Sequence, residues 1–111
     1  MLYFSAHWCP PCRGFTPELA SFYEAHAAAK NFEVVFLSSD RSEEDFAAYY
    51  DEMPWLAVPL ADKATKAALS AKFEVRGIPT LILLDKEGNT VTKSARAKVV
   101  SSPGTFPAWK D

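Results

Sequence analysis

Two cysteines separated by two prolines are the residues of this sequence best suited to chemistry. Cys9 and Cys12 are the only cysteines among the 111 residues, and the segment around them reads Trp-Cys-Pro-Pro-Cys. A thiolate attacks a disulfide through a mixed-disulfide intermediate, and a second thiol within reach then completes the exchange. The spacing therefore predicts a redox-active dithiol, in which Cys9 attacks a substrate disulfide and Cys12 releases the reduced product.

A structural disulfide and a zinc site are the alternatives for this pair. A bridge over two residues closes a short loop and removes little entropy from the unfolded chain. A structural zinc ion takes four ligands, and the sequence has no second cysteine pair and only two histidines, His7 and His26. His7 lies too close to the pair along the chain, and His26 falls within an expected helix. Both alternatives are disfavoured, and we expect no metal and no cofactor.

The segments on either side of the pair are expected to activate the first thiol. The apolar residues 2–6 predict a buried strand, and residues 10–30 predict a helix, since prolines fit a first helical turn. The partial positive charge of a helix N-terminus favours a thiolate, so we expect a lowered pKa for Cys9. Because both prolines lack an amide proton, the amides of Cys12 and Arg13 are expected to be the donors nearest to the Cys9 sulfur, and the shift to be moderate.

A proline far downstream indicates where a substrate would bind. Pro79 follows Ile78 at the head of an expected strand, where a proline cannot donate to a sheet. A cis Ile78–Pro79 bond would explain this position and leave the Ile78 backbone free to pair with an incoming peptide beside Cys9. Trp8 and Pro10 are expected at the rim of the same site. The alternatives are a trans Pro79 that ends a loop and a Trp8 that is an ordinary core aromatic.

Length, composition and charge limit the remaining function classes. The 111 residues, 49% apolar and 23% charged, are typical of one globular domain, which we place at residues 1–111. The net charge of −2 and the absence of a lysine or arginine cluster argue against a nucleic-acid partner. No stretch approaches the roughly 20 apolar residues of a membrane span, and no secretory signal is visible. We therefore expect a cytoplasmic protein without a membrane partner.

The order of the other expected elements predicts an α/β fold. Strands are expected over residues 32–38, 81–84 and 90–92, helices between Ser42 and Pro54 and over residues 63–73 and 95–100, a short extended piece within residues 53–60, and a turn at residues 85–89. Parallel strands come first and an antiparallel hairpin last, so the sheet should be mixed. Ala67, Leu69 and Ala71 are expected on the buried side of the third helix. A solvated face is expected to contain Asp40, Arg41, Glu43 and Glu44.

Several segments spread over the chain carry the pattern of one protein family. They are residues 3–17, 31–34, 53–59, 77–82 and 106–109. Together these segments resemble the nucleoredoxin and tryparedoxin branch of the thioredoxin-like superfamily, and Trp-Cys-Pro-Pro-Cys together with Met-Pro-Trp-Leu is typical of this branch. Residues 38–44 resemble nucleoredoxin more than tryparedoxin.

The resemblance implies a thioredoxin-like fold, a central mixed sheet flanked by helices, in which the family's N-terminal strand and helix are short or missing and a sheet edge is exposed. It implies a protein-disulfide reductase whose partners are disulfide-containing proteins and an upstream thiol donor, either thioredoxin reductase, glutathione or trypanothione. A redox-gated binding module of the nucleoredoxin type, and a tryparedoxin that passes electrons from trypanothione to a peroxidase, are the alternatives. A nuclear location is implied beside the cytoplasmic one.

Two further positions bear on the site that the resemblance implies. Arg96 matches an arginine that tryparedoxins use near the substrate, so it is a candidate substrate-binding residue. Tyr3 stands six residues before the first cysteine, where thioredoxins have a buried acid. Deprotonation of Cys12 is therefore expected to depend on another group, with water and a substrate group as the alternatives.

Overall fold

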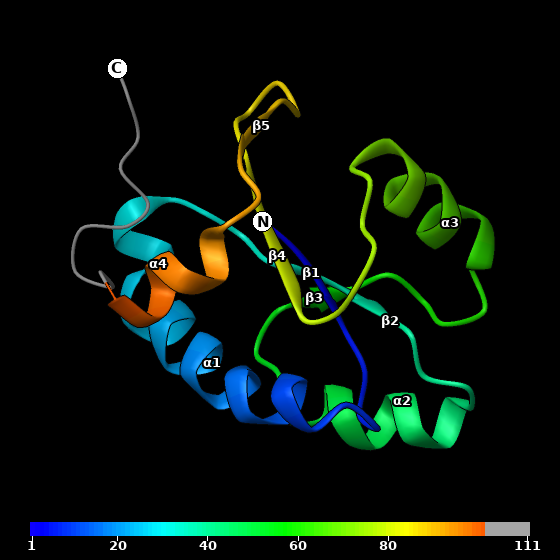
Figure 1. The fold of residues 1–111 in the computed structure, drawn as a ribbon. Coiled ribbons are helices and arrows are strands. Elements are labelled where there is room, and N and C mark those ends of the chain that lie inside the picture. Colours follow the sequence, from blue (N-terminus) through cyan, green and yellow to red (C-terminus); the bar gives the residue numbers. More distant parts are fainter. Residues whose placement is uncertain (102–111) are drawn as a thin grey trace.

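A mixed sheet with β1 (Leu2–Ser5) at its centre organises the chain (Figure 1). The computed structural model describes residues 1–101. The other strands are β2 (Val35–Ser38), β3 (Leu56–Ala57), β4 (Thr80–Leu84) and β5 (Thr90–Thr92), and their order across the sheet is β3-β2-β1-β4-β5. β1, β2 and β3 are parallel, whereas β4 runs antiparallel to β1 and β5 antiparallel to β4. The expected α/β fold, with parallel strands first and a hairpin last, is confirmed.

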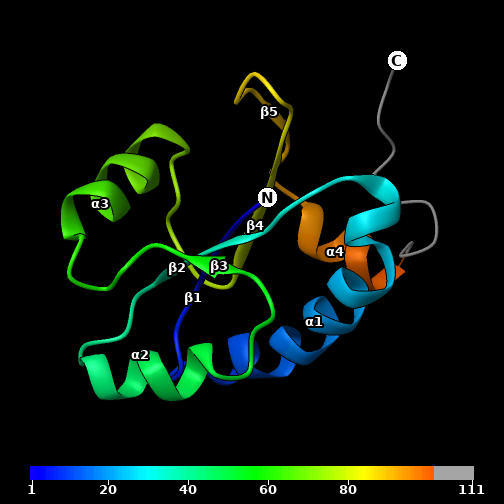
Figure 2. The same cartoon turned by 180° about the vertical axis from the view of Figure 1, so that it is seen from behind.

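Helices cover both faces of the sheet. α1 (Pro10–Lys30), α2 (Glu43–Tyr50) and α4 (Ala95–Ser101) lie on one face, and α3 (Lys63–Lys72) lies on the other (Figures 1 and 2). Ser42 caps α2, because its hydroxyl accepts a hydrogen bond from the Asp45 amide. Among residues 1–101, no helix has the length and apolar character needed to cross a membrane.

The sheet divides the core, because successive residues of a strand point to opposite faces. Tyr3 lies among the aromatic rings on the side of α1 and α2, with its ring centroid 6.0 Å from those of Phe36 and Trp55. Phe4 points to the opposite side and packs in one cluster with Phe73, which follows α3. β1 is buried after its first residue, so packing on both faces fixes the strand and the position of the segment that follows it.

β2 is shorter than the sequence predicts, because it begins at Val35 and not at Phe32. α1 ends with Asn31 in the left-handed region (φ 58°), and the Phe32 amide donates to the carbonyl oxygen of Ala27 at 3.1 Å. Phe32 therefore closes the helix, and its ring stacks on that of Phe22 with centroids 5.3 Å apart. Phe32, although a β-forming residue, thus packs on α1 and not in the sheet.

α3 packs more lightly than the sequence predicts. Ala67 and Ala71 are exposed, and α3 has no fully buried residue, so their expected placement on a buried side is wrong. Leu69 is partly buried and packs in the cluster that contains Phe73. Phe73, just after the helix, is only 5% exposed. The larger side chains at the end of α3 thus cover the sheet, and the alanines face solvent.

The sheet has short strands at both edges. β3 and β5, which form these edges, have two and three residues. Short edge strands offer little backbone for pairing with another chain. β1 begins at Leu2, and no helix precedes it among the described residues. The tail motif at residues 106–109 lies outside the described part of the chain.

Candidate active site around Cys9 and Cys12

The turn between β1 and α1 places the two cysteines at the start of the helix. Cys9 is the N-cap residue, with extended backbone angles (φ −98°, ψ 108°), and its amide donates to the Ala6 carbonyl oxygen at 3.2 Å. Both thiols are free, and Cys9 is 6% exposed whereas Cys12 is completely buried. Within residues 1–101, no three His, Cys, Asp or Glu side chains lie close enough to hold a metal ion. The first thiol is therefore the one nearer to solvent.

The Cys9 side chain does not receive the hydrogen bonds that the sequence predicts. The Arg13 amide donates to the carbonyl oxygen of Cys9 at 3.0 Å, and the Cys9 side chain accepts no capping hydrogen bond. The carbonyl oxygen is the acceptor because the ladder of α1 starts at this residue. The Cys9 sulfur therefore lies at the N-terminus of α1 without a direct bond from an amide of the first turn.

The Ile78–Pro79 segment lies beside the cysteine pair, as the sequence predicts. The Ile78–Pro79 peptide bond is cis, and Ile78 packs against the small cluster that contains Cys9 and Cys12. Arg96 of α4 reaches the same segment, since its guanidinium group donates to the Pro79 carbonyl oxygen over a long 3.5 Å. The start of α1, the loop into β4 and the first turn of α4 therefore meet at one place.

Trp8 and Pro10 are both exposed next to Cys9. The alternative in which Trp8 is a core aromatic is therefore wrong. Trp8 is 52% exposed, and its indole N–H donates to the Ser39 carbonyl oxygen at 3.0 Å. The guanidinium carbon of Arg41 lies 5.5 Å from the centroid of the indole ring, within the range of a cation–π contact. The segment that follows β2 thus holds Trp8 in place beside Cys9.

Asp40 is buried and does not belong to a solvated face, contrary to the expectation from the sequence. It is 8% exposed, and its carboxylate accepts hydrogen bonds from the His7 amide and the Ser38 hydroxyl, each at 2.7 Å. A carboxylate needs such donors when it leaves water. These bonds connect the end of β2 to the segment that precedes Trp8, so Asp40 has a structural part in the site.

Four buried hydroxyl groups lie behind Cys12, and the sequence analysis missed them. The Thr16 hydroxyl donates to the Cys12 carbonyl oxygen at 3.0 Å and lies 2.5 Å from the Tyr49 hydroxyl. Tyr49 is 2.6 Å from the Ser5 hydroxyl, and Tyr3 is 2.7 Å from that of Thr16. All four side chains are at most 1% exposed. We call these four residues the hydroxyl network. The sequence contains one signal of it, because Ser5 is a polar residue on a strand that is expected to be buried.

The environment of Cys12 raises the pKa of its thiol. Burial raises the pKa of the Cys12 thiol to about 11, and the neighbouring Cys9 sulfur adds to the rise. Hydrogen bonds with the Ser5 hydroxyl and the Ala6 backbone act in the opposite direction on this pKa. Burial also raises the pKa of both tyrosines of the hydroxyl network. The reduced site is therefore uncharged at Cys12 near neutral pH.

The reduced protein is expected to lose stability as the pH rises from 9 to 11. The pKa of Cys12 is about 11 when folded and 9.0 as an ordinary thiol, so the unfolded chain loses this proton first and ionisation favours unfolding. The loss begins near pH 9 and is complete only above pH 11; it totals about 3 kcal/mol, since one pKa unit is about 1.4 kcal/mol, and about 2 kcal/mol of it falls between pH 9 and 11. Urea unfolding of the reduced protein across this range measures the loss. Cys12→Ser should lose less by this amount, and equal losses would contradict the assignment.

Both cysteines and the Ile78–Pro79 segment fall within residues 1–90, which match a family profile described as thioredoxin-like. The chain belongs to the thioredoxin-like family. Relatives of this thioredoxin-like chain include nucleoredoxin from Danio rerio, 50% identical over 109 residues (96% of the chain and 26% of that protein). Tryparedoxin from Trypanosoma brucei brucei is 53% identical over 109 residues (96% of the chain and 76% of that protein). The chain thus spans about a quarter of that nucleoredoxin and three quarters of that tryparedoxin.

The expected place of the chain in the nucleoredoxin and tryparedoxin branch is confirmed. The two identities, 50% and 53%, do not place it nearer to nucleoredoxin than to tryparedoxin. Tryparedoxin II complexed with glutathionylspermidine has a TM-score of 0.92 at 48% identity, and tryparedoxin I from Leishmania major has 0.92 at 50%. Each match covers 99% of this thioredoxin-like chain and 78% of the other. The thioredoxin-like fold is confirmed, and these relatives support a redox activity.

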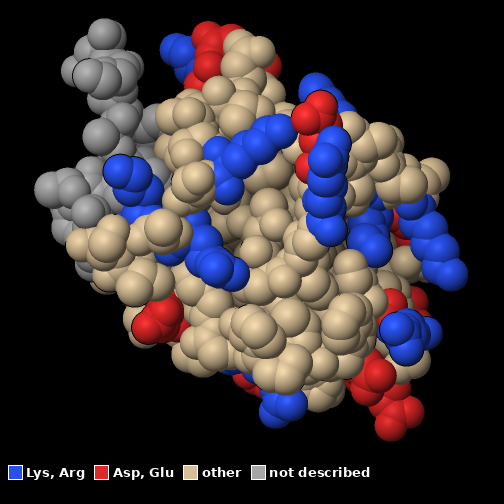
Figure 3. All heavy atoms as spheres, viewed as in Figure 1, with Lys and Arg blue, Asp and Glu red and all other residues tan. Residues whose placement is uncertain are grey.

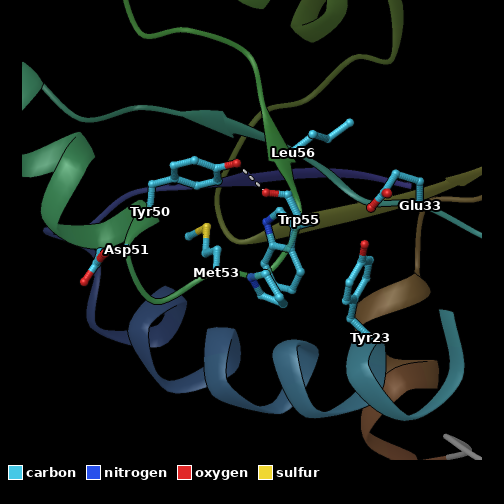
Figure 4. Close-up of a pocket in the computed structure, with 8 residues that line it drawn as sticks. Tyr23, Glu33, Tyr50, Asp51, Met53, Trp55 and Leu56 are labelled. Atoms are coloured by element: carbon cyan, nitrogen blue, oxygen red, sulfur yellow. Dashed lines mark hydrogen bonds between the residues drawn. The ribbon is translucent and has the colours of Figure 1, made fainter. Parts of the chain in front are cut away.

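A pocket of about 460 Å³ in the thioredoxin-like chain is formed by other residues (Figure 4). It is lined by Tyr23, Glu33, Tyr50, Asp51, Met53, Pro54, Trp55 and Leu56. The Tyr50 hydroxyl donates to the Trp55 carbonyl oxygen, as Figure 4 shows, and the Tyr23 ring packs edge-on against the indole with centroids 5.6 Å apart. None of the lining residues belongs to the cysteine cluster or to the hydroxyl network, so we assign this pocket no part in the dithiol chemistry.

Proposed function

We propose that this chain is a thiol–disulfide oxidoreductase that reduces protein disulfides through Cys9 and Cys12. The observation that carries the proposal is the position of Cys9 at the start of α1, packed in one cluster with Ile78 and with the fully buried Cys12. Disulfide exchange needs one thiol within reach of the substrate and a second thiol within reach of the first. Two cysteines three residues apart at a helix start supply this pair.

The proposed reaction has two steps, and in each of them one S–S bond forms as another breaks. The Cys9 thiolate attacks the client disulfide, so that a Cys9–client disulfide forms and the other client sulfur leaves with its electron pair and takes up a proton. Cys12 then loses its proton and attacks the Cys9 sulfur, which forms the Cys9–Cys12 disulfide and releases the second client thiol. The client gains two electrons, and an upstream thiol donor returns two electrons to the chain.

The proposed client surface combines Trp8, Pro10, Ile78, Pro79 and Arg96. On the face shown in Figure 3, uncharged residues cover the start of α1 and the loop into β4, and lysine or arginine side chains stand at several points of the border. The Ile78 backbone is proposed to pair with the main chain of the client beside Cys9. Main-chain pairing depends little on the client's side chains, so one surface can bind disulfides in different sequence contexts.

The proposed electron donor is a low-molecular-weight thiol of the glutathione type. One similar structure, tryparedoxin II, is complexed with glutathionylspermidine. This likeness favours glutathione or trypanothione, with thioredoxin reductase as the alternative donor. A cytoplasmic location, together with a nuclear one, belongs to the same proposal, because these compartments keep thiols reduced.

Reduction of insulin disulfides, followed by turbidity, tests the proposed activity. We expect the chain to accelerate the reduction by dithiothreitol, and Cys9→Ser to return it to the background rate. Glutathione, trypanothione and thioredoxin reductase with its own reductant, offered in parallel, then identify the donor. A rate for the unmodified chain no higher than that of Cys9→Ser would leave the redox-gated binding module as the remaining function.

A further inference from the structure

The second step of the proposed reaction requires Cys12 to give up a proton although, among residues 1–101, no carboxylate acts on its thiol. Tyr3 occupies the position at which thioredoxins carry a buried acid, and it is completely buried. In the described part of the chain, the groups that act on the Cys12 thiol are Cys9, Ser5 and the Ala6 backbone, and none of them is a carboxylate. The stabilisation of a Cys12 thiolate must therefore come from neutral donors.

We propose that the hydroxyl network supplies this stabilisation by reversing the direction of its hydrogen bonds when Cys12 changes from thiol to thiolate. Ser5, which acts on the Cys12 thiol, is the member that turns to the reacting sulfur, and the three other hydroxyl groups, from Tyr49, Thr16 and Tyr3, are positioning groups. The network keeps its own four protons throughout, because each hydroxyl group has one proton and can both donate and accept. This inference rests on the proposed function and concerns its second step alone.

The hydroxyl groups form a continuous path from Ser5 to the Cys12 carbonyl oxygen, and we infer one further link, from Ser5 to the Cys12 sulfur. The Ser5 hydroxyl, which lowers the pKa of the Cys12 thiol, lies 2.6 Å from the Tyr49 hydroxyl. Tyr49 lies 2.5 Å from Thr16, which reaches the carbonyl oxygen at 3.0 Å. In every link between two hydroxyl groups, either oxygen can be the donor. The heavy-atom positions are therefore compatible with both directions of the path.

With Cys12 as a thiol, all donors along this path point away from the sulfur. The thiol donates to Ser5, and Ser5 donates to Tyr49. Tyr49 then donates to Thr16, and Thr16 donates to the Cys12 carbonyl oxygen, the direction that its geometry shows. Every proton on the path has an acceptor, which a buried polar group requires.

With Cys12 as a thiolate, the same donors point toward the sulfur. Ser5 donates to the anion, Tyr49 donates to Ser5, and Thr16 turns from the carbonyl oxygen to Tyr49. Tyr3 then donates to the Cys12 carbonyl oxygen in place of Thr16, since its hydroxyl lies 3.4 Å from this oxygen. Hydrogen bonds to an ionised group are about twice as strong as neutral ones, and a chain of donors strengthens each member. The network thus favours the anion by rotation of hydroxyl groups.

The proton that Cys12 loses does not enter the network. As the Cys12 sulfur attacks Cys9, the Cys9–client bond breaks and the client sulfur leaves with the electron pair. This leaving sulfur takes up the proton, either directly or through water, so one thiol is consumed and one is produced. With thionitrobenzoate as the leaving group, which departs as a stable anion, the proton goes to water instead.

Reaction of the reduced chain with dithiobis(nitrobenzoate) separates the two steps. The first thionitrobenzoate is released when Cys9 attacks the reagent, and the second when Cys12 resolves the Cys9 adduct. Ser5→Ala is expected to slow the second phase about tenfold near neutral pH, because a hydrogen bond to a charged group is stronger than one between neutral groups. Tyr49→Phe should slow this phase about threefold, since it removes one buried hydrogen bond. The first phase should keep its rate in both variants.

Tyr50→Phe is the matched control for Tyr49→Phe. Tyr50 is the next residue of α2 and also loses a hydrogen bond in this variant, but its partner is the Trp55 carbonyl oxygen, outside the hydroxyl network. Its second phase should keep the rate of the unmodified chain. Circular dichroism and thermal unfolding establish that each variant is folded, and Ser5→Ala provides the test if Tyr49→Phe does not fold.

The pH profile of the second phase separates thiolate stabilisation from a loosened structure. Ser5→Ala should move the profile upward by about one pH unit, in line with a tenfold loss of thiolate. Cys9 is masked in the adduct, so the titratable groups near the network are its two tyrosines and His7, whose ring lies 5.5 Å from that of Tyr49. Asp40 accepts from the His7 amide. His7→Gln, with and without Ser5→Ala, removes any contribution of the imidazole to the profile.

The outcomes distinguish this inference from the proposed function. An unchanged second phase in both Ser5→Ala and Tyr49→Phe would overturn the role of the network while the reductase proposal stands. An equal slowing in Tyr49→Phe and Tyr50→Phe would also overturn it, because the effect would then follow from the packing of α2. A reduced chain that releases no thionitrobenzoate from Cys9 would instead contradict the reductase itself.

Discussion

A Cys12→Ser variant is expected to hold its clients as covalent complexes and to lose turnover by about 100-fold or more, because an attack within one chain has a far higher effective concentration than an external thiol. Serine removes the buried nucleophile and leaves the exposed edge of the site unchanged, since Cys12 is completely buried and Cys9 is not. The Cys9–client disulfide then has no partner to resolve it. Non-reducing gels and mass spectrometry of mixtures with oxidised insulin detect the complex.

The control for this trap is the double variant Cys9→Ser, Cys12→Ser, which has no attacking thiol and should give no complex. Dithiothreitol should release the client from the single variant, because an external thiol can replace the missing one at high concentration. A single variant that traps no client and still turns over at the original rate would show that Cys12 does not resolve the intermediate.

Phe36→Ala is expected to lower the free energy of unfolding by about 3–5 kcal/mol, the usual effect of deleting a buried aromatic ring. Phe36 on β2 is completely buried. Its ring centroid lies 6.0 Å from that of Tyr3, 5.9 Å from Phe46, 5.5 Å from Tyr49 and 6.4 Å from Tyr50. The ring joins α2 to the centre of the sheet, so its loss leaves a cavity between two elements. Urea unfolding at neutral pH measures the change.

Leu56→Ala is the comparison for this loss of stability. Leu56 is 61% exposed on the edge strand β3, and its truncation should change the free energy of unfolding by no more than about 0.5 kcal/mol. Similar losses in both variants would mean that the aromatic cluster around Phe36 contributes little beyond ordinary apolar area. Because Tyr49 belongs to that cluster, Phe36→Ala should also slow the second phase of the exchange, whereas Leu56→Ala should not.

The features that the sequence predicts correctly depend on residues close together in the chain. The helix that starts after Cys9 follows from the two prolines, and the cis bond at Pro79 follows from a proline at a strand start. Each of these depends on local backbone chemistry. The expected position of the Ile78–Pro79 segment beside Cys9 was drawn from these two motifs together, and Ile78 does pack against the cysteine cluster. β2 was misplaced because Phe32 has a strand-forming side chain but packs on a helix.

The features that were missed depend on contacts between distant residues. Ser5 and Tyr49 are 44 positions apart, and their hydroxyl groups meet only because α2 packs on one face of the sheet that contains β1. Asp40 reads as a surface acid until the His7 amide, 33 positions away, is seen to donate to it. The direction in which a polar side chain points depends on strand register and on helix packing. Neither can be read from residue type alone, so buried polar contacts were the least predictable part of the site.

The parallel arrangement of β1 and β2 has a consequence for how such a site diversifies. β1 and β2 are parallel, so their carboxyl ends lie side by side. The segments that follow these two ends are joined by hydrogen bonds, from Trp8 to Ser39 and from His7 to Asp40. The segment after β2 therefore forms one wall of the reactive centre without supplying any of its sulfur chemistry. Exchanging Arg41, which contacts Trp8, should change which clients are accepted, while Cys9 and Cys12 stay unchanged. Selectivity and reactivity can thus evolve as separable traits on one scaffold.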